Sequence, residues 1–365
     1  MATKRLLLAA SICAVATSAA GLNPAHAQFY KGKTLNVVIN YGAGGNTDVQ
    51  GRTLMRYFEK YIDGSPRVVV RNMPGAGGAV GANFMNKGAK KDGTFMGVFT
   101  TPWMPELADS GVLTASLKDL IYIGAIGQQQ IAHARTDIGG DGKTKSIDGF
   151  LKNAVVFKSA GHAPTTSKDI AIKVTLRMLG IKHEHVTGFK SAGPIRRAIM
   201  QNEIQYTEDS LAGYFGGVVP NLVAKGTSIP LWHNGVLGED GLLHHAASVP
   251  KEIPTFTDVY KMKFGKDAMP KGLDWQLYKT IAGARTTLRT VVLPPGAPKE
   301  AVAALRAAWL KTVKDKDYLA EYKKKNNSEL EWKTGEATEK QINEVLTVSP
   351  ELRTHVQALA GIKKK

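Results

Sequence analysis

Cysteine is almost absent from this sequence: Cys13 is the single cysteine among 365 residues. One cysteine forms no disulfide within the chain, so the protein is no disulfide scaffold and a hydrophobic core must stabilise it. No stretch reaches the roughly 18 to 20 apolar residues that a transmembrane helix requires. These two absences predict a soluble protein with an ordinary core.

Aromatic and acidic residues are also scarce. Aromatics make up 7% of the chain, and 31 Asp and Glu stand against 48 Lys and Arg, for a formal net charge of +17. Such a surface attracts anions. Nucleic acid is not expected as a partner, because the basic residues are spread along the chain and aromatics are few. A basic protein that binds the cell envelope stays open as an alternative.

The first 27 residues have the pattern of a signal peptide. Lys4 and Arg5 precede an apolar stretch over 6–16, and small residues, Ala25 and Ala27, stand where a signal peptidase reads. We expect cleavage after Ala27 and export of the mature chain.

Two glycine-rich loops, residues 41–48 and 74–81, each follow a β-branched run and precede a helix-like segment. Glycine lets a ligand approach the backbone, and the first turn of a helix offers unpaired N–H donors at the positive end of its dipole. A dinucleotide fingerprint is missed, because Thr47 and Val80 replace its last glycine. The loops predict a carboxylate or phosphate site, with plain strand-to-helix turns as the structural alternative.

Strands that alternate with helical stretches predict parallel-sheet α/β units, and the length allows two domains. We expect strands over 34–39, 68–70 and 95–99, with a helix from Thr47 between the first two. A second amphipathic helix is expected over 299–313.

The middle of the chain contains a short echo, because the segment 157–161 recurs as 189–193. Each copy places a serine, Ser159 or Ser191, and a glycine after a β-like segment. The echo indicates either a second face for the anion or two unrelated strand ends of similar composition.

These motifs, in this order, resemble the substrate-binding receptors of tripartite tricarboxylate transporters, the Bug-type periplasmic proteins. The segment 72–81 matches the family's second loop, asparagine-any-proline-glycine-alanine-glycine-glycine with a later glycine. The segment 40–48 is similar to the family's first loop, with two prolines and one glycine replaced. The segment 189–194 resembles a third landmark, after which the family's strand-end aspartate falls on Asp209. The family's ligand-facing loop is not recognisable over 159–168.

The resemblance implies an α/β fold of the type II periplasmic-binding-protein class, with two α/β lobes and a ligand cleft between them. Lobe 1 would comprise 28–131 and 246–365, and lobe 2 would comprise 132–245. The ligand set that the resemblance carries over is Tyr41, Ala43, Gly44, Asn46, Thr47, Asp48, Gly75, Gly77, Gly78, Ala79, Ser159, Lys190, Ser191, Ala192 and Asp209. For Asp209 and Lys190, a structural role at a strand end or at the cleft rim stays open.

The implied function is that of a periplasmic solute receptor. It would bind a small organic anion, a mono-, di- or tricarboxylate, mainly through main-chain amides, and deliver it to the subunits of a membrane transporter. Such a cradle would discriminate little among carboxylates. We expect a monomer.

An exported α/β hydrolase is the enzyme alternative, but Phe157 and Phe189 stand where a G-x-S-x-G elbow needs its first glycine. His183 and His185 share one face of an expected strand, without the further ligands that a metal needs. We therefore expect no enzyme activity, no metal and no cofactor.

Overall fold

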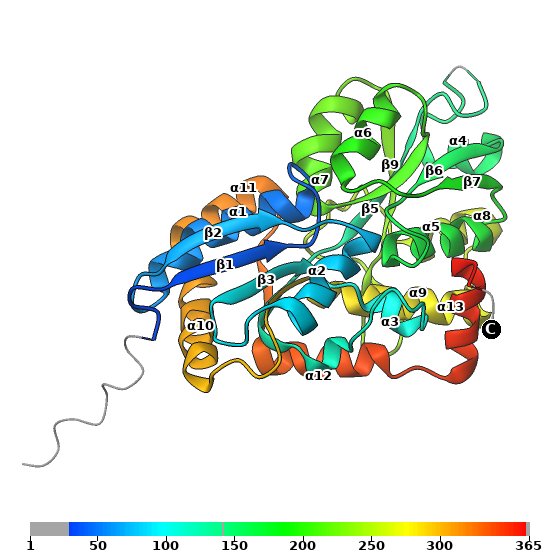
Figure 1. The fold of residues 1–365 in the computed structure, drawn as a ribbon. Coiled ribbons are helices and arrows are strands. Elements are labelled where there is room, and N and C mark those ends of the chain that lie inside the picture. Colours follow the sequence, from blue (N-terminus) through cyan, green and yellow to red (C-terminus); the bar gives the residue numbers. More distant parts are fainter. Residues whose placement is uncertain (1–28, 141, 363–365) are drawn as a thin grey trace, which may run out of the picture.

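A computed structural model describes residues 29–140 and 142–362 (Figure 1). The expected signal peptide, residues 1–27, lies outside these residues. Within them, no helix combines the length and the apolar character that crossing a bilayer requires.

The chain forms two mixed α/β units, each built on its own sheet (Figure 1). The first sheet has six strands in the order β13-β4-β12-β3-β1-β2, in which β1 pairs in parallel with β2 and β3 while β12 runs antiparallel to β3 and β4. Its strands are β1 (Thr34–Ile39), β2 (Arg67–Asn72), β3 (Phe95–Thr100), β4 (Ile121–Gly127), β12 (Arg289–Leu293) and β13 (Glu331–Thr334). The three strands predicted from the sequence are confirmed.

The second sheet has five strands in the order β7-β6-β8-β5-β9. Its strands are β5 (Gln130–Arg135), β6 (Phe157–Ala160), β7 (His183–Val186), β8 (Tyr206–Ser210) and β9 (Ser228–His233). A two-stranded ribbon of β10 (Val236–Leu237) and β11 (Leu243–His244) follows β9. Strand β8 lies between β6 and β5, so both of its edges are paired, and all five of its residues are buried.

Helices cover both sheets. The helices around the first sheet are α1 (Asn46–Phe58), α2 (Ala79–Asn83), α3 (Trp103–Leu107), α10 (Lys299–Thr312), α11 (Lys316–Asn326) and α12 (Gly335–Leu346). The remaining helices are α4 (Ile147–Asn153), α5 (Ser167–Met178), α6 (Ala192–Met200), α7 (Leu211–Gly213), α8 (Phe256–Phe264), α9 (Gly272–Ala284) and α13 (Pro350–Ala360). Short 3-10 or π segments are η1 (Glu59–Tyr61), η2 (Ala76–Gly78), η3 (Phe84–Gly88), η4 (Leu117–Asp119), η5 (Tyr214–Val223) and η6 (Arg285–Thr287).

Helix α1 shows how the sequence pattern sets the packing. Its apolar residues recur by three and four, so Met55 and Phe58 face the first sheet, and Ile62 continues this buried row beyond the helix. The amphipathic helix predicted over 299–313 is confirmed as α10, whose Trp309 packs in the same cluster.

The chain passes from the first sheet to the second between β4 and β5 and returns just before β12. The predicted limits place 246–365 in lobe 1, yet α8 packs on β9 and α4 of the second sheet, and Thr255 bridges to His233. The C-terminal helix α13 lies against α5 and α9 (Figure 1). The lobe limits stay a prediction.

Candidate ligand site between the two sheets

A cavity of about 50 Å³ lies where segments of both sheets meet. The first sheet and its loops contribute Tyr41, Asn46, Thr47 and Thr100. The second contributes His162, Thr166, Ser167, Lys168, Ser191, Ala192 and Ser210. Gln130 at the start of β5, Arg289 at the start of β12, and Arg285 and Leu288 just before β12 complete the lining.

Three helices begin at this cavity, one from the first unit and two from the second. Helix α1 follows the N-cap Gly45, α5 follows Thr166, and α6 follows Ser191. The first N–H groups of a helix lack a partner within the helix and carry its positive partial charge. Neither Gly45 nor Ser191 caps its helix through a side chain. The three helix starts therefore favour an anion between them.

Three cationic side chains, Lys168, Arg285 and Arg289, line the same cavity and are each more than nine-tenths buried. Burial lowers the pKa of all three groups, that of Arg289 to about 10. Arg289 is held by Gln50 Oε1 at 2.8 Å and Thr100 Oγ1 at 2.7 Å. Buried cations are costly unless they meet an anion, so the cavity has the charge of a carboxylate site.

Tyr41 and His162 close one side of the cavity. The Tyr41 hydroxyl donates to the Gly77 carbonyl at 3.0 Å, and its ring meets the His162 ring edge to face at 5.1 Å. Burial and the nearby Lys168 lower the pKa of His162 to about 4, so the ring is neutral at pH 7. Its Nδ1 therefore donates to the Phe189 carbonyl, 2.9 Å away.

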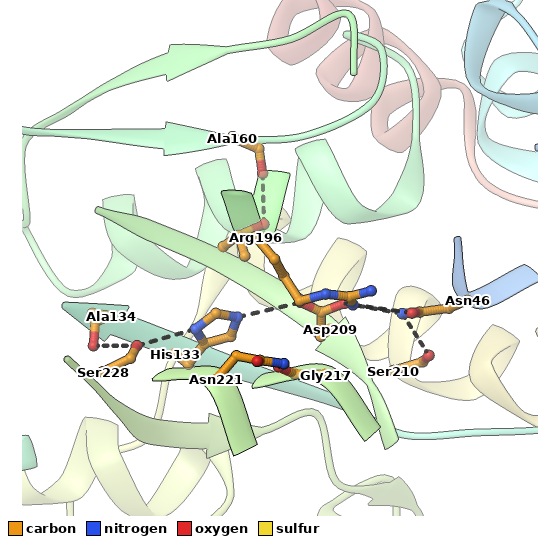
Figure 2. A network of polar contacts seen from close by, with 11 residues as sticks. Asn46, His133, Ala134, Ala160, Arg196, Asp209, Ser210, Gly217, Asn221 and Ser228 are labelled. Carbon is orange, nitrogen blue, oxygen red and sulfur yellow. Dashed lines mark hydrogen bonds and ion pairs between the residues drawn. The ribbon is translucent and has the colours of Figure 1, made fainter. Parts of the chain in front are cut away.

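A buried carboxylate, Asp209, joins the two units beside the cavity (Figure 2). It accepts from Asn46 Nδ2 and Arg196 Nη1, both at 2.9 Å, and contacts His133 Nε2 at 3.3 Å. Asn46 Oδ1 in turn accepts from Arg196 at 3.0 Å. Burial alone would raise the pKa of Asp209, but Arg196 and His133 outweigh it and hold this pKa well below its usual range. Asp209 is therefore an ionised clamp between β8, α6 and α1.

The two units are closed on each other at the glycine loops. The Gly42 N–H donates to the Lys190 carbonyl at 3.1 Å. A Cβ on Gly45 would lie 2.6 Å from Ser191 Cβ, and a Cβ on Gly77 would lie 2.5 Å from Thr166 Cγ2. Glycine is needed at both positions because the opposite unit occupies the space of a side chain.

The structure divides the residues proposed from the sequence into two groups. Those that line the cavity are Tyr41, Asn46, Thr47, Ser191 and Ala192. Those that do not line it are Ala43, Gly44, Asp48, Gly75, Gly77, Gly78, Ala79, Ser159, Lys190 and Asp209. A ligand contact by any of the fifteen stays a prediction.

Two residues of the second group serve the loops themselves. The Asp48 carboxylate accepts from the Gly44 N–H at 2.9 Å and from Asn72 Nδ2 at 2.8 Å, which holds the first loop on β2. Lys190 is exposed and contributes its carbonyl to Gly42.

The echo of 157–161 in 189–193 has no structural counterpart. Ser159 lies inside strand β6, fully buried, whereas Ser191 is the N-cap of α6. Only the second copy starts a helix at its serine, so the two copies differ in structure, and a second face for the anion stays a prediction. Among residues 29–140 and 142–362 no group of three His, Cys, Asp or Glu is placed to hold a metal.

Sequence reasoning missed the three cations. Lys168 offered a signal, since a lysine in the first turn of a helix opposes the dipole and needs another reason to be there. Arg285 is the first residue of the short η6 turn, and Arg289 is the first residue of the buried strand β12 that follows it. The expected cradle of main-chain amides thus gains buried guanidinium groups, which no glycine motif predicts.

A larger cavity of about 690 Å³ lies beside the first, on the far side of Asn46. Its lining includes residues of α1, Arg196 of α6, Phe215 of η5 and Lys325 of α11. Asn46 lines both cavities, so the Asp209 clamp lies at the boundary between them.

Known proteins resemble this chain in sequence and in fold. No protein-family model matches it. A "UPF0065 protein in gbd 5'region" of Cupriavidus necator is 37% identical over 226 residues, which span 57% of this chain and 64% of that protein, less than two thirds of its length.

Solved structures match over nearly the whole chain. The periplasmic binding protein BugD has a TM-score of 0.67 at 17% identity, over 92% of this chain and 100% of BugD. MatC of Rhodopseudomonas palustris with bound malate has a TM-score of 0.61 at 15% identity, over 90% of this chain and 99% of MatC. An R. palustris protein with adipate has a TM-score of 0.64 at 14% identity, over 90% of this chain and 98% of that protein. The resemblance and the periplasmic-binding-protein fold predicted from the sequence are confirmed.

Proposed function

We propose that this protein is a periplasmic solute receptor that binds a small carboxylate-bearing metabolite between its two lobes and delivers it to a membrane transporter. The observation that carries the proposal is the convergence of Lys168, Arg285 and Arg289 with three helix N-termini on one buried cavity. Each of these features favours negative charge in the cavity.

The similar structures support the choice of ligand class. MatC holds malate and a second protein of the same organism holds adipate, and both ligands carry two carboxylates. Because the buried groups here are cations, an acidic metabolite is a better match than a neutral sugar or a cationic peptide.

The ligand bridges the two lobes of the receptor. Asn46 and Thr47 face the ligand from the first lobe, while Ser167 and Ser191 face it from the second. A ligand that contacts both sides stabilises the closed arrangement, and a membrane partner can recognise that arrangement. Arginine fixes two oxygens in one plane, so Arg285 makes the site more selective than a cradle of main-chain amides alone.

A hydrolase is less well supported. Ser159 Oγ lies 2.9 Å from His185 Nδ1, and His185 Nε2 lies 2.8 Å from Asp169 Oδ1, which is the connectivity of a catalytic triad. Ser159 is fully buried in strand β6, however, and does not line the interlobe cavity. A substrate cannot reach a nucleophile in that position, so the chain acts as a receptor without converting its ligand.

The signal-peptide pattern of the first 27 residues supports export with cleavage after Ala27. The mature receptor is proposed to be a periplasmic monomer. Membrane transporter subunits are the partner that this role requires. Sequencing the N-terminus of the exported protein tests the cleavage site, and Gln28 is the expected first residue.

A melting screen tests the function. Malate, adipate, monocarboxylates and tricarboxylates are compared with the uncharged diamides of malic and adipic acid. A ligand at a hundred times its dissociation constant adds about 2.7 kcal/mol of apparent stability, which raises the melting temperature by several degrees. We expect such a rise with at least one carboxylate and none with the diamides. The absence of a shift with every carboxylate would contradict the proposal.

A further inference from the structure

Glu208 is a buried acid that the receptor mechanism has not used. It lies in strand β8 with 1% of its surface exposed, and its Oε2 has no hydrogen-bond partner among the described residues. The nearest cationic group is Arg285, whose Nη2 is 3.5 Å from Oε2. This ion pair is longer than the 2.7 to 2.9 Å typical of a charge-assisted hydrogen bond.

Arg285 is equally poorly satisfied. Within the described chain its Nε and Nη2 donate no hydrogen bond, and its Nη1 reaches Ser167 Oγ at 3.4 Å. The guanidinium lines the interlobe cavity, whereas Glu208 lies behind it. A free carboxylate in the cavity can accept two parallel hydrogen bonds from such a fork, which Glu208 does not do.

Charged and titratable groups on several elements influence the charge of Glu208. They are Arg285 of η6, Lys168 and Asp169 of α5, Asp209 and Tyr206 of β8, and Tyr278 of α9. The two cations favour ionised Glu208, while the two aspartates oppose it. The tyrosines are neutral, because burial raises the pKa of both well above its ordinary value.

Burial is the largest influence on Glu208 itself. It outweighs the attraction of Arg285 and Lys168 and raises the pKa of Glu208 to about 7. At pH 8 the side chain is therefore mostly ionised, but any loss of positive charge from its surroundings favours the protonated form.

We infer, building on the proposed receptor function, that a ligand carboxylate replaces Glu208 as the partner of Arg285, and that Glu208 takes up one proton from solvent as the ligand binds. Glu208 is then neutral beside an Arg285–ligand ion pair, so the buried charges balance. Receptor, ligand anion and proton thus associate in one linked equilibrium.

Ligand affinity therefore depends on pH. Between pH 8 and pH 7 the unliganded protein must gain the proton on binding, so affinity rises as the pH falls, by up to tenfold per unit. Below about pH 6 Glu208 is already protonated in the unliganded protein, and the dependence disappears. His162 stays neutral throughout this range.

Isothermal titration calorimetry measures the proton directly. Malate and adipate are titrated into the full mature protein at pH 8, in two buffers whose heats of ionisation differ. We expect an uptake close to one proton per ligand in the natural protein and close to zero in Glu208→Gln. The variant should also bind more tightly at pH 8, and its affinity should not change from pH 8 to pH 6.

Glu331→Gln is the matched control, because burial raises the pKa of Glu331 too, but this residue lies in β13 and does not line the cavity. Its proton uptake should equal that of the natural protein. Binding of malate or adipate without proton uptake would overturn this inference and leave the receptor function standing, as would uptake that persists in Glu208→Gln. No binding by any carboxylate, in either protein, would instead contradict the receptor function.

Discussion

Strand β8 places two adjacent acids, Glu208 and Asp209, on opposite faces, and the pKa values of the two carboxyl groups shift in opposite directions. Asp209 points to the clamp side, where Asn46, Arg196 and His133 contact its carboxylate (Figure 2). Glu208 points to the other side, where one guanidinium approaches to 3.5 Å. Burial penalises both charges, yet the pKa of Asp209 is held well below its usual range and that of Glu208 is raised to about 7.

The difference lies in the partners and not in the burial. A carboxylate with several close donors stays ionised and fixes the structure around it, whereas one with a single distant cation can give that cation up. The clamp side thus holds the lobes together, and the other side leaves a cation available to a ligand.

Removing the clamp carboxylate should have the largest effect on stability. Asp209→Ala leaves Arg196 beside the lobe contact without its anion, and breaking a buried ion pair typically costs about 3 to 5 kcal/mol. Because the folded pKa of Asp209 is depressed, its contribution is fully present at pH 7 and is lost only as the pH falls below about 4. Urea denaturation at pH 7 measures it. A loss of less than about 1 kcal/mol would contradict the clamp.

Glu208 should show the reverse dependence on pH. Its raised pKa means that its contribution to stability is full below about pH 4.5 and is lost as the pH rises through 7, by about 3 kcal/mol in all. Glu208→Gln removes this term, so the variant should gain stability relative to the natural protein between pH 5 and pH 8. Denaturation curves of both proteins across this pH range give the difference in their free energies of unfolding. The contributions of the other titrating groups cancel in this difference. A constant difference would show that Glu208 does not titrate there.

A smaller effect is expected where the lobes touch. Gly45→Ala places a methyl group against Ser191 at 2.6 Å, and such overpacking costs about 1 to 3 kcal/mol in the closed form. The backbone at Gly45 is extended, so alanine itself is not strained. Ligand affinity should fall about tenfold or more, as measured by calorimetry.

Two variants serve as controls for this contact. Gly193→Ala lies next to Ser191, but its methyl group meets nothing closer than 3.9 Å, so affinity should be unchanged. Ser191→Gly in the Gly45→Ala background removes the clash and should recover part of the lost affinity, although it also removes a hydroxyl that lines the cavity. A Gly45→Ala protein that binds as well as the natural one would mean that the closed contact is not required.

The glycine loops of the site could be predicted from the sequence, but its buried cationic side chains could not. Glycine patterns are local, so the loops at 41–48 and 74–81, and the helix that follows the first, could be read from the sequence. Arg285 and Lys168 come together only through the tertiary fold, from a crossing segment and a helix of the second lobe more than a hundred residues away. The pairing of Asn46 with Asp209 joins residues 163 positions apart and is hidden for the same reason.

The repeated pentapeptide left two interpretations open, because tertiary position determines the structure of each copy. Ser159 and Ser191 lie in identical pentapeptides, but Ser159 is interior to a strand and Ser191 precedes a helix as its N-cap. Local sequence cannot distinguish these cases, because the partner strands on either side of Ser159 come from residues elsewhere in the chain.

A crystal structure of the mature protein with malate at pH 8 tests the central claim most directly. The account predicts a malate carboxylate in the cavity between the lobes, with both of its oxygens about 3 Å from Arg285 nitrogens, and Glu208 no longer paired with that guanidinium. Malate bound instead in the larger cavity near Arg196 and Lys325, with the Glu208–Arg285 pair intact, would contradict it.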